Sequence, residues 1–127
     1  MTDTPLALRA LRGATTASAN TAAAMSAAVD ELLDALIAEN QLKGELVLTA
    51  TFSVTADLNA LFPASLARRR PGWDGVALLD CQQMQVEGDL VRCIRVLVQA
   101  WMPEDQPVSH PYLRDAARLR PDRSGHN

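Results

Sequence analysis

Residues 93–101 read Cys93-Ile94-Arg95-Val96-Leu97-Val98-Gln99-Ala100-Trp101, and their side chains alternate between two kinds, which predicts a β-strand. The even-numbered row from Ile94 to Ala100 is wholly apolar and is expected to face a core. The odd-numbered row carries Arg95. An arginine inside such a strand needs an anionic partner or contact with water. The stretch therefore predicts an anion beside the sheet, which is either an acidic side chain or a bound ligand.

Four other segments have strand patterns. Residues 6–12 alternate and are expected to end at Gly13, before a turn at Thr15-Thr16, which puts Arg12 at a strand end. Residues 46–52 place Leu46, Leu48, Ala50 and Phe52 on one face. Residues 76–79 predict a further strand, and residues 116–119 are a candidate for a last short one.

Two helices are expected between these strands. The first begins at a cap, Ser18 or Asn20, and ends near Asn40, with the apolar stripe Met25, Val29, Leu32, Leu33, Leu36 and Ile37 facing the core. The second is short and runs from Pro63 to about Arg70, where Pro71-Gly72 ends it.

This order of elements predicts an α+β fold, in which a mixed β-sheet carries a long and a short helix on one face. Residues 1–119 are expected to form a single domain, and residues 120–127 a flexible C-terminal tail. So few helices leave one apolar sheet face uncovered, so we expect the chain to associate with copies of itself.

The composition of the chain excludes several classes of function and partner. A net charge of −3 argues against a nucleic-acid partner. Eleven arginines accompany a single lysine, Lys43, which is compatible with an anion site but also with a codon bias. Neither a signal peptide nor a membrane span is recognisable, so we expect a cytoplasmic protein without a membrane partner. Cys81 and Cys93 lack metal-ligand spacing and are expected to be free thiols, and no metal site or cofactor is expected.

Several motifs together resemble one family, the monofunctional bacterial chorismate mutases of the trimeric α/β-barrel type. The resemblance rests on Arg12-Gly13-Ala14-Thr15-Thr16, Thr55-Ala56-Asp57-Leu58-Asn59-Ala60-Leu61-Phe62-Pro63-Ala64, Cys93-Ile94-Arg95-Val96, His110-Pro111-Tyr112-Leu113 and Leu119-Arg120-Pro121-Asp122. It implies a homotrimer that forms a pseudo-α/β-barrel, with active sites between subunits, and the rearrangement of chorismate to prephenate in phenylalanine and tyrosine biosynthesis.

The resemblance also implies roles for individual residues. Arg95 matches the cation beside the ether oxygen of chorismate, Arg12 a carboxylate ligand, and Tyr112 a hydroxyl donor to a carboxylate. The wall contributed by a second subunit is matched by Phe62, Ala64, Ser65 and Arg68. Leu78 and Leu79 are further candidate substrate-binding residues. Leu119 matches an apolar lid residue, and Arg120 an arginine at the start of the tail. The reaction is unimolecular and needs charge stabilisation rather than a catalytic base.

The chain departs from the family pattern at three positions. Ser65 stands where lysine is common, Asp80 where a small residue is usual, and Gln83 where glutamate accepts a hydrogen bond from the substrate hydroxyl. We therefore expect Asp80 to supply the anion that Gln83 lacks and to orient Arg95, which requires a bend near Gln82. In the alternative, Asp80 is a surface residue and Gln83 suffices.

Other functions stay open at this point. The two substitutions at Ser65 and Gln83 are compatible with a catalytically weak trimer that binds dicarboxylates or regulates a partner. An imine-hydrolysing enzyme of the trimeric Rid type also places an arginine in an intersubunit cleft. The intact Arg12, Arg95 and Tyr112 favour the mutase.

Overall fold

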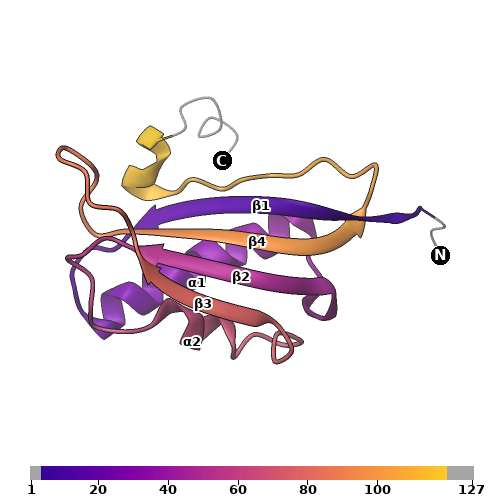
Figure 1. Ribbon diagram of the computed structural model, residues 1–127, viewed down its shortest axis with the longest axis horizontal. Coiled ribbons are helices and arrows are strands. Elements are labelled where there is room, and N and C mark those ends of the chain that lie inside the picture. The colour runs from indigo at the N-terminus through magenta and orange to yellow at the C-terminus, as the bar shows by residue number, and fades with distance from the viewer. Residues whose placement is uncertain (1–3, 120–127) are drawn as a thin grey trace.

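The computed structural model describes residues 4–119. Its centre is a four-stranded sheet in the order β1-β4-β2-β3 (Figure 1). The strands and helices are β1 (Leu6–Thr16), α1 (Ala22–Asn40), β2 (Val47–Val54), α2 (Pro63–Ala67), β3 (Ala77–Gln82) and β4 (Cys93–Pro103). Short 3₁₀ helices lie at Gly44–Leu46 and Arg114–Leu119.

The sheet is mixed because β4 enters it in the opposite direction to its neighbours. β4 pairs antiparallel with β1 on one side and with β2 on the other, while β2 and β3 are parallel. Both helices lie behind the sheet in Figure 1, where each connects two strands that run the same way. This arrangement confirms the α+β prediction of a mixed sheet with a long and a short helix on one face.

The alternation predicted for residues 93–101 is confirmed in β4. Ile94, Val96, Val98 and Ala100 are all buried against the helices, whereas Arg95, Leu97, Gln99 and Trp101 keep contact with solvent on the other face. The helix stripe from Met25 to Leu36 is likewise buried, with Ile37 partly so. The core therefore fills the space between the sheet and α1.

Local expectations for the first two strands were wrong. β1 continues through Gly13 to Thr16, so Arg12 lies within the strand and Thr15-Thr16 is not a turn. β2 has an irregular register between Val47 and Thr49, which buries Val47 and exposes Leu48. One extra residue in a strand reverses the faces of the residues before it.

Two further expectations differ from the structure. The cap of α1 is Thr21 rather than Ser18 or Asn20, and its hydroxyl accepts a hydrogen bond from the Ala24 amide at 3.0 Å. Residues 116–119 belong to the 3₁₀ helix and form no strand. The predicted tail, residues 120–127, lies outside the described residues.

Two glycines let separate turns approach each other. A Cβ atom on Gly44 would lie 2.6 Å from the carbonyl oxygen of Pro71, closer than real Cβ atoms come to backbone. Gly72 faces it with a φ of +83°, which favours glycine. The close contact between these glycines packs the segment before β2 against the turn that follows α2.

The chain between β4 and the last 3₁₀ helix, residues 104–113, runs along the free edge of β1 (Figure 1). We call this segment the strap. Its backbone pairs with the free edge of β1 around Ala14, through Pro111 and Leu113, and the Arg12 amide donates to His110 Nδ1 at 2.9 Å. The strap covers backbone groups that an edge strand leaves exposed.

Asn40, at the end of α1, holds the strap from the other side. Its side chain is buried, donates to the Ser109 carbonyl at 2.9 Å and accepts from the Ser109 amide at 2.7 Å. The Gln106 side chain donates to the Asn40 carbonyl at 2.7 Å. The end of the helix and the strap therefore form one hydrogen-bonded unit.

The sheet face away from the helices carries several large apolar side chains. Leu6 and Leu8 on β1, Leu79 on β3, and Leu97 and Trp101 on β4 are each between 40 and 59% exposed. Across residues 4–119, no helix has both the length and the apolarity that crossing a membrane requires.

The buried contacts of Asn40 predict a clear loss of stability on substitution. Asn40→Leu keeps most of the volume but leaves the Ser109 amide and carbonyl without partners, and we expect it to lower the unfolding free energy by roughly 2–3 kcal/mol. Chemical denaturation at a fixed protein concentration measures the change. Asp74→Asn, on an exposed turn away from the strap, is the control and should alter stability by less than about 0.5 kcal/mol. An equally small effect of Asn40→Leu would contradict this account of the strap.

Candidate functional site

Two arginines from adjacent strands share a cleft on the face of the sheet away from the helices. Arg12 pairs with Leu97 and Arg95 pairs with Ala14, so the two arginines occupy diagonal positions on β1 and β4. Diagonal neighbours in an antiparallel pair lie about 7–8 Å apart. The cleft has a volume of about 180 Å³ and is lined by Arg12, Gly13, Thr51, Ser53, Arg95, Val96, Leu97 and Tyr112. We call it the arginine cleft.

The charges in the arginine cleft are incompletely balanced by the chain itself. Within residues 4–119, Arg12 has no ion-pair partner, and Arg95 has one, Asp89, at 3.7 Å. The Nε atom of Arg95 is buried and has no hydrogen-bond partner among the described residues. Two neighbouring guanidinium groups with free donors form a site for an anion with two acceptor groups.

Tyr112 reaches the arginine cleft from the strap. Its backbone forms a parallel bridge with Ala14, and its neighbours Pro111 and Leu113 hydrogen-bond the Ala14 amide and carbonyl at 3.0 and 2.8 Å. The ring of Tyr112 packs in a small second cluster with Ala14, Ala116, Leu90 and Leu119. Leu119, the predicted lid residue, therefore lies beside the tyrosine, while Arg120 falls outside the described residues.

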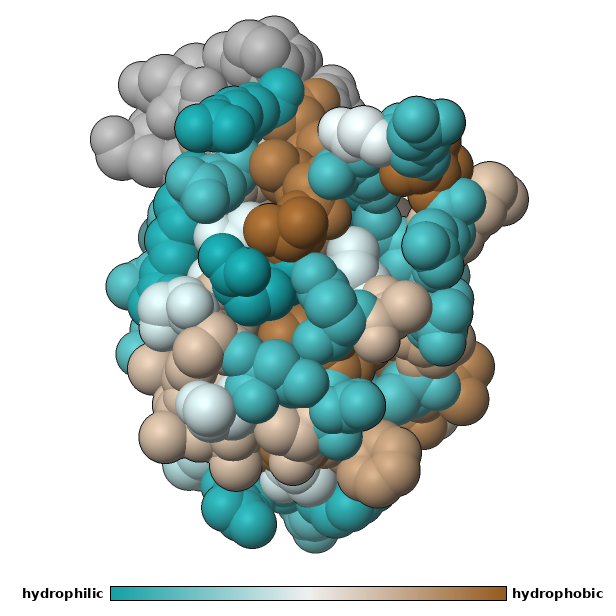
Figure 2. Space-filling model, turned by 90° about the vertical axis from the view of Figure 1, so that its left-hand side faces the viewer, coloured by the Kyte–Doolittle hydropathy of each residue, from teal (hydrophilic) through white to brown (hydrophobic). Residues whose placement is uncertain are grey.

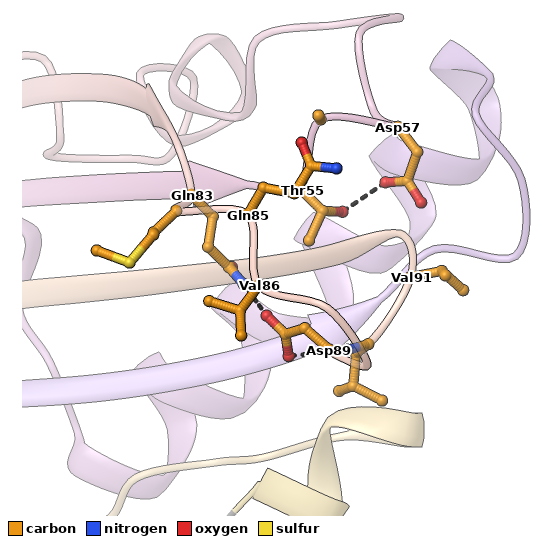
Figure 3. Close-up of a pocket in the computed structure, with 10 residues that line it drawn as sticks. Thr55, Asp57, Gln83, Gln85, Val86, Asp89 and Val91 are labelled. Carbon is orange, nitrogen blue, oxygen red and sulfur yellow. Dashed lines mark hydrogen bonds between the residues drawn. The ribbon is translucent and has the colours of Figure 1, made fainter.

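The loop between β3 and β4 contacts Arg95 through Asp89 and lines a separate pocket with the residues that follow β2. Figure 3 shows the Gln83 side chain extended toward Asp89, with a hydrogen bond between them. Gln83 Nε2 donates to Asp89 Oδ2 at 2.8 Å, and the Leu90 amide donates to Asp89 Oδ1 at 2.8 Å. Gln83 Oε1 is buried without a partner among residues 4–119. It is an acceptor in need of a donor.

Cys93 is the other titratable group next to Arg95. Burial raises the pKa of the Cys93 thiol, and the nearby Arg95 guanidinium, which lowers it, offsets this only in part. The thiol is therefore neutral near pH 7 and does not balance the charge of Arg95. Both cysteines are free, as the sequence predicts.

Asp80 does not lie beside Arg95 within one chain. It pairs through Phe52 with Val96, and these side chains face the helices, whereas Ser53, the partner of Arg95, faces the opposite side. Asp80 Oδ1 instead accepts a hydrogen bond from the Ala64 amide at 3.0 Å. The expected bend that would bring Asp80 and Gln83 into one pocket of the chain is absent from the described β3. The carboxylate beside Arg95 in this chain is Asp89.

Phe62, one of the residues predicted to come from a second subunit, lines a separate cleft. It has a volume of about 440 Å³, lies between β2, β3 and the start of α2, and is lined by residues that include Phe62 and Asp80. Phe62 is 73% exposed, and Arg68, the residue that caps the end of α2, is also exposed. We call this the Phe62 cleft.

Not every residue of the predicted wall is equally accessible. Ala64 is buried in the core and Leu78 packs partly against it, while Leu79 is exposed on the face away from the helices. The Ser65 hydroxyl donates to the Phe62 carbonyl at 2.6 Å. The site roles of these residues stay predictions, because none of them lines the arginine cleft of its own chain.

Figure 2 views the molecule from the end at which β1 and β2 finish and β4 begins. Hydrophilic side chains are interleaved there with hydrophobic ones. The loops that follow β2 and β3 meet at this end, where Arg92 binds the Asp57 carboxylate through its amide.

The sequence alone did not predict that Asp89 contacts Arg95. Asp89 lies six residues after Gln83 in a loop of mixed polar and apolar residues, and no periodicity links it to a strand face. An acidic residue next to Gly88, close before the arginine strand, was the available signal.

Comparison with known proteins agrees with this geometry. A family model described as chorismate mutase type I matches residues 8–123. The chain is 41% identical over 119 residues to the chorismate mutase AroH of Bacillus subtilis, covering 92% of this chain and 93% of that protein. It is 42% identical over 119 residues to AroH of Thermus thermophilus, covering 91% and 95%.

A solved chorismate mutase from Clostridium thermocellum has a similar fold. The two superpose with a TM-score of 0.80 at 38% sequence identity, covering 87% of this chain and 99% of the other. The chain is thus an α+β protein with the sheet of the chorismate mutases. It belongs to the chorismate mutase type I family and is an enzyme that isomerises chorismate to prephenate.

The environment of Asp80 predicts a pH-dependent effect on stability. Burial raises the pKa of the Asp80 carboxyl, and the Ala64 amide and the Arg68 charge, which lower it, do not fully compensate. A pKa that is higher in the folded chain means that ionisation disfavours folding, and this penalty is complete above the folded-state pKa. Asp80→Asn should therefore raise the melting temperature at pH 7.

The advantage of Asp80→Asn should shrink as the pH falls through the folded-state pKa, and disappear below the unfolded-state pKa. Thermal unfolding followed by circular dichroism across this range measures it. Asp74→Asn, on an exposed turn, controls for the change in net charge. A lower melting temperature for Asp80→Asn at pH 7 would mean that the amide and Arg68 outweigh burial.

Proposed function

We propose that the arginine cleft binds chorismate as a dianion and promotes its rearrangement through charge alone. The observation that carries this assignment is the pair of adjacent arginines, Arg12 and Arg95, with donors that the described chain leaves free. Chorismate has two carboxylates, and Arg12 and the Tyr112 hydroxyl are suited to hold them. Gln83 Oε1 is suited to accept the hydrogen bond of the substrate hydroxyl.

The chemistry of the reaction fits such a site. The rearrangement breaks a C–O bond and forms a C–C bond within one molecule, so no proton is transferred and no base is required. Binding in the compact conformation lowers the entropic part of the barrier. Negative charge grows on the ether oxygen as the C–O bond breaks, and a guanidinium held at that position stabilises the transition state more than the ground state. We assign this role to Arg95.

We further propose that the active unit is a homotrimer with a pseudo-α/β-barrel arrangement, in which the arginine cleft of one subunit faces the Phe62 cleft of the next. Leu6, Leu8, Leu97 and Trp101 on the face away from the helices supply apolar surface for the contact. Phe62 and Arg68 then close the site from the neighbouring subunit, together with Ser65 and Leu79. In such a trimer Asp80 also belongs to this second wall, and its influence on Arg95 acts between chains.

The wider biological setting is also a proposal. We place the enzyme in the cytoplasm, in the synthesis of phenylalanine and tyrosine, without a cofactor, metal or nucleic-acid partner. Residues 1–119 make up the catalytic domain, and Arg120 contributes from the tail to the substrate carboxylates. A catalytically weak dicarboxylate-binding trimer is the competing reading, because Ser65 and Gln83 each remove a charge that the family usually carries.

Substitution of Arg95 tests the catalytic assignment directly. Purified protein is mixed with chorismate, and the loss of the diene absorbance and the identity of prephenate are followed. Arg95→Ala should lower kcat by about 10²–10³-fold while the melting temperature changes little, because the guanidinium acts on transition-state charge. Arg69→Ala, an exposed arginine outside both clefts, is the control. Activity of Arg95→Ala within threefold of the parent, or no activity in the parent, would exclude the assignment.

Mixed trimers test the shared site. Chains carrying Arg95→Ala and chains carrying Arg68→Ala should each be weakly active, and exchange between them should restore about a quarter of the sites if assembly is random. Arg95→Ala mixed with Arg12→Ala is the matched control, because both residues come from the same subunit and no intact site can form. A particle mass three times the chain mass of 13.7 kDa is expected. Proven exchange without recovery would contradict sites between subunits.

A further inference from the structure

We propose that Asp89 is a positioning residue that, together with Gln83, replaces the glutamate usual in this family and orients the guanidinium of Arg95. The inference rests on the proposed catalytic role of Arg95. It concerns a residue in the loop between β3 and β4 that touches Arg95 and not the substrate.

Both oxygens of the Asp89 carboxylate are used within the chain. Oδ2 accepts the hydrogen bond from Gln83 Nε2 at 2.8 Å, and Oδ1 accepts from the Leu90 amide at 2.8 Å (Figure 3). Oδ1 also lies 3.7 Å from Nη2 of Arg95. The side chain of Asp89 is only 23% exposed, so its charge is less screened than that of a surface pair.

The loop that carries Asp89 is fixed at both ends. The Gln83 amide donates to the Val54 carbonyl at 2.8 Å, and the Arg92 carbonyl accepts from the Ala17 amide at 2.8 Å. Between them, the Asp89 amide closes a turn onto Val86 at 3.1 Å, with Gly88 at a φ of +84°. These contacts hold the carboxylate at a set distance from β4, which is what a positioning role requires.

The charge balance explains why a carboxylate is needed there. Arg12 and Arg95 repel each other across the diagonal of the β1–β4 pair. The neutral amide of Gln83 can accept a hydrogen bond but cannot offset this repulsion. Asp89 pairs with Nη2 of Arg95 on the side of the loop, which leaves Nε of Arg95 free for the substrate.

The same hydrogen bond sets the orientation of Gln83. Because Nε2 is held by Asp89, the other end of the amide, Oε1, is left as an acceptor without a partner among the described residues. One carboxylate therefore positions two groups, the cation and the hydroxyl acceptor.

A neutral residue at position 83 and a carboxylate at position 89 depend on each other. Glutamate at position 83 would put two carboxylates within hydrogen-bonding distance of each other, and they could not both remain ionised without cost. Each single change should therefore damage the site, whereas changing both moves the charge back to position 83. This reciprocal dependence is a property that a merely structural aspartate would not have.

The experiment is a double-mutant cycle on the full-length enzyme, with kcat and KM for chorismate measured separately. Asp89→Asn should lower kcat by about tenfold or more with a smaller change in KM, because Arg95 acts mainly in the transition state. Gln83→Glu alone should also lower kcat. The double variant, Gln83→Glu with Asp89→Asn, should recover to within about threefold of the parent, a strongly non-additive result.

Glu87→Gln removes a charge from an exposed position of the same loop and should leave kcat unchanged. Melting temperatures of all variants identify any that fail to fold. If Asp89→Asn is unstable, Asp89→Glu is measured instead, because it keeps the charge. Its kcat is expected to exceed that of Gln83→Glu. Unchanged or increased kcat in Asp89→Asn, or effects that simply add, would overturn the inference while the parent remains active. An inactive parent enzyme would instead overturn the proposed function.

Discussion

β4 lies between β1 and β2 and is hydrogen-bonded along both edges, and the geometry of the arginine cleft depends on that pairing. Its even-numbered side chains must face the helices because they are apolar, so Arg95 must face the other way. The antiparallel register with β1 then brings Arg12 to the diagonal position, and the register with β2 brings Ser53 opposite Arg95. A shift of β1 by one residue against β4 would move Arg12 to the core side of the sheet.

The sequence was sufficient to predict those features that depend on side-chain alternation and helical periodicity. The two faces of β4 and the buried stripe of α1 follow from patterning over nine or more residues, and both were predicted. The end of β1 was not, because Gly13 and the two threonines after Ala14 resemble a turn. Pairing with the distant strand β4 keeps them extended, and Tyr112 adds a bridge at Ala14. The irregular register at Val47 likewise depends on β4 rather than on local sequence.

The candidate site likewise contains residues that the sequence predicted and contacts that it did not. Arg12, Arg95 and Tyr112 were found through motifs, and the chain brings them into one cleft. The contact between Asp89 and Arg95 depends on the path of a loop of about ten residues, and loop paths carry no periodic signal. For Asp80, alternation along β3 gave the correct warning that it and Gln83 face different ways. The expectation that a bend overcomes this was the step that failed within one chain.

The position of β1 between β4 and the strap also affects the order in which the molecule folds. The partners of β1 lie far along the chain, from 77 residues away at the Thr16–Cys93 pair to 97 residues at the Leu6–Pro103 pair, and Ala14 is closed off only by Pro111 and Leu113. Closing such long loops before their contacts form slows folding. During synthesis, the first strand must wait unpaired until nearly the whole chain has left the ribosome. The apolar residues of β1 are thus exposed longest in the nascent protein, at the stage when a chaperone can bind them.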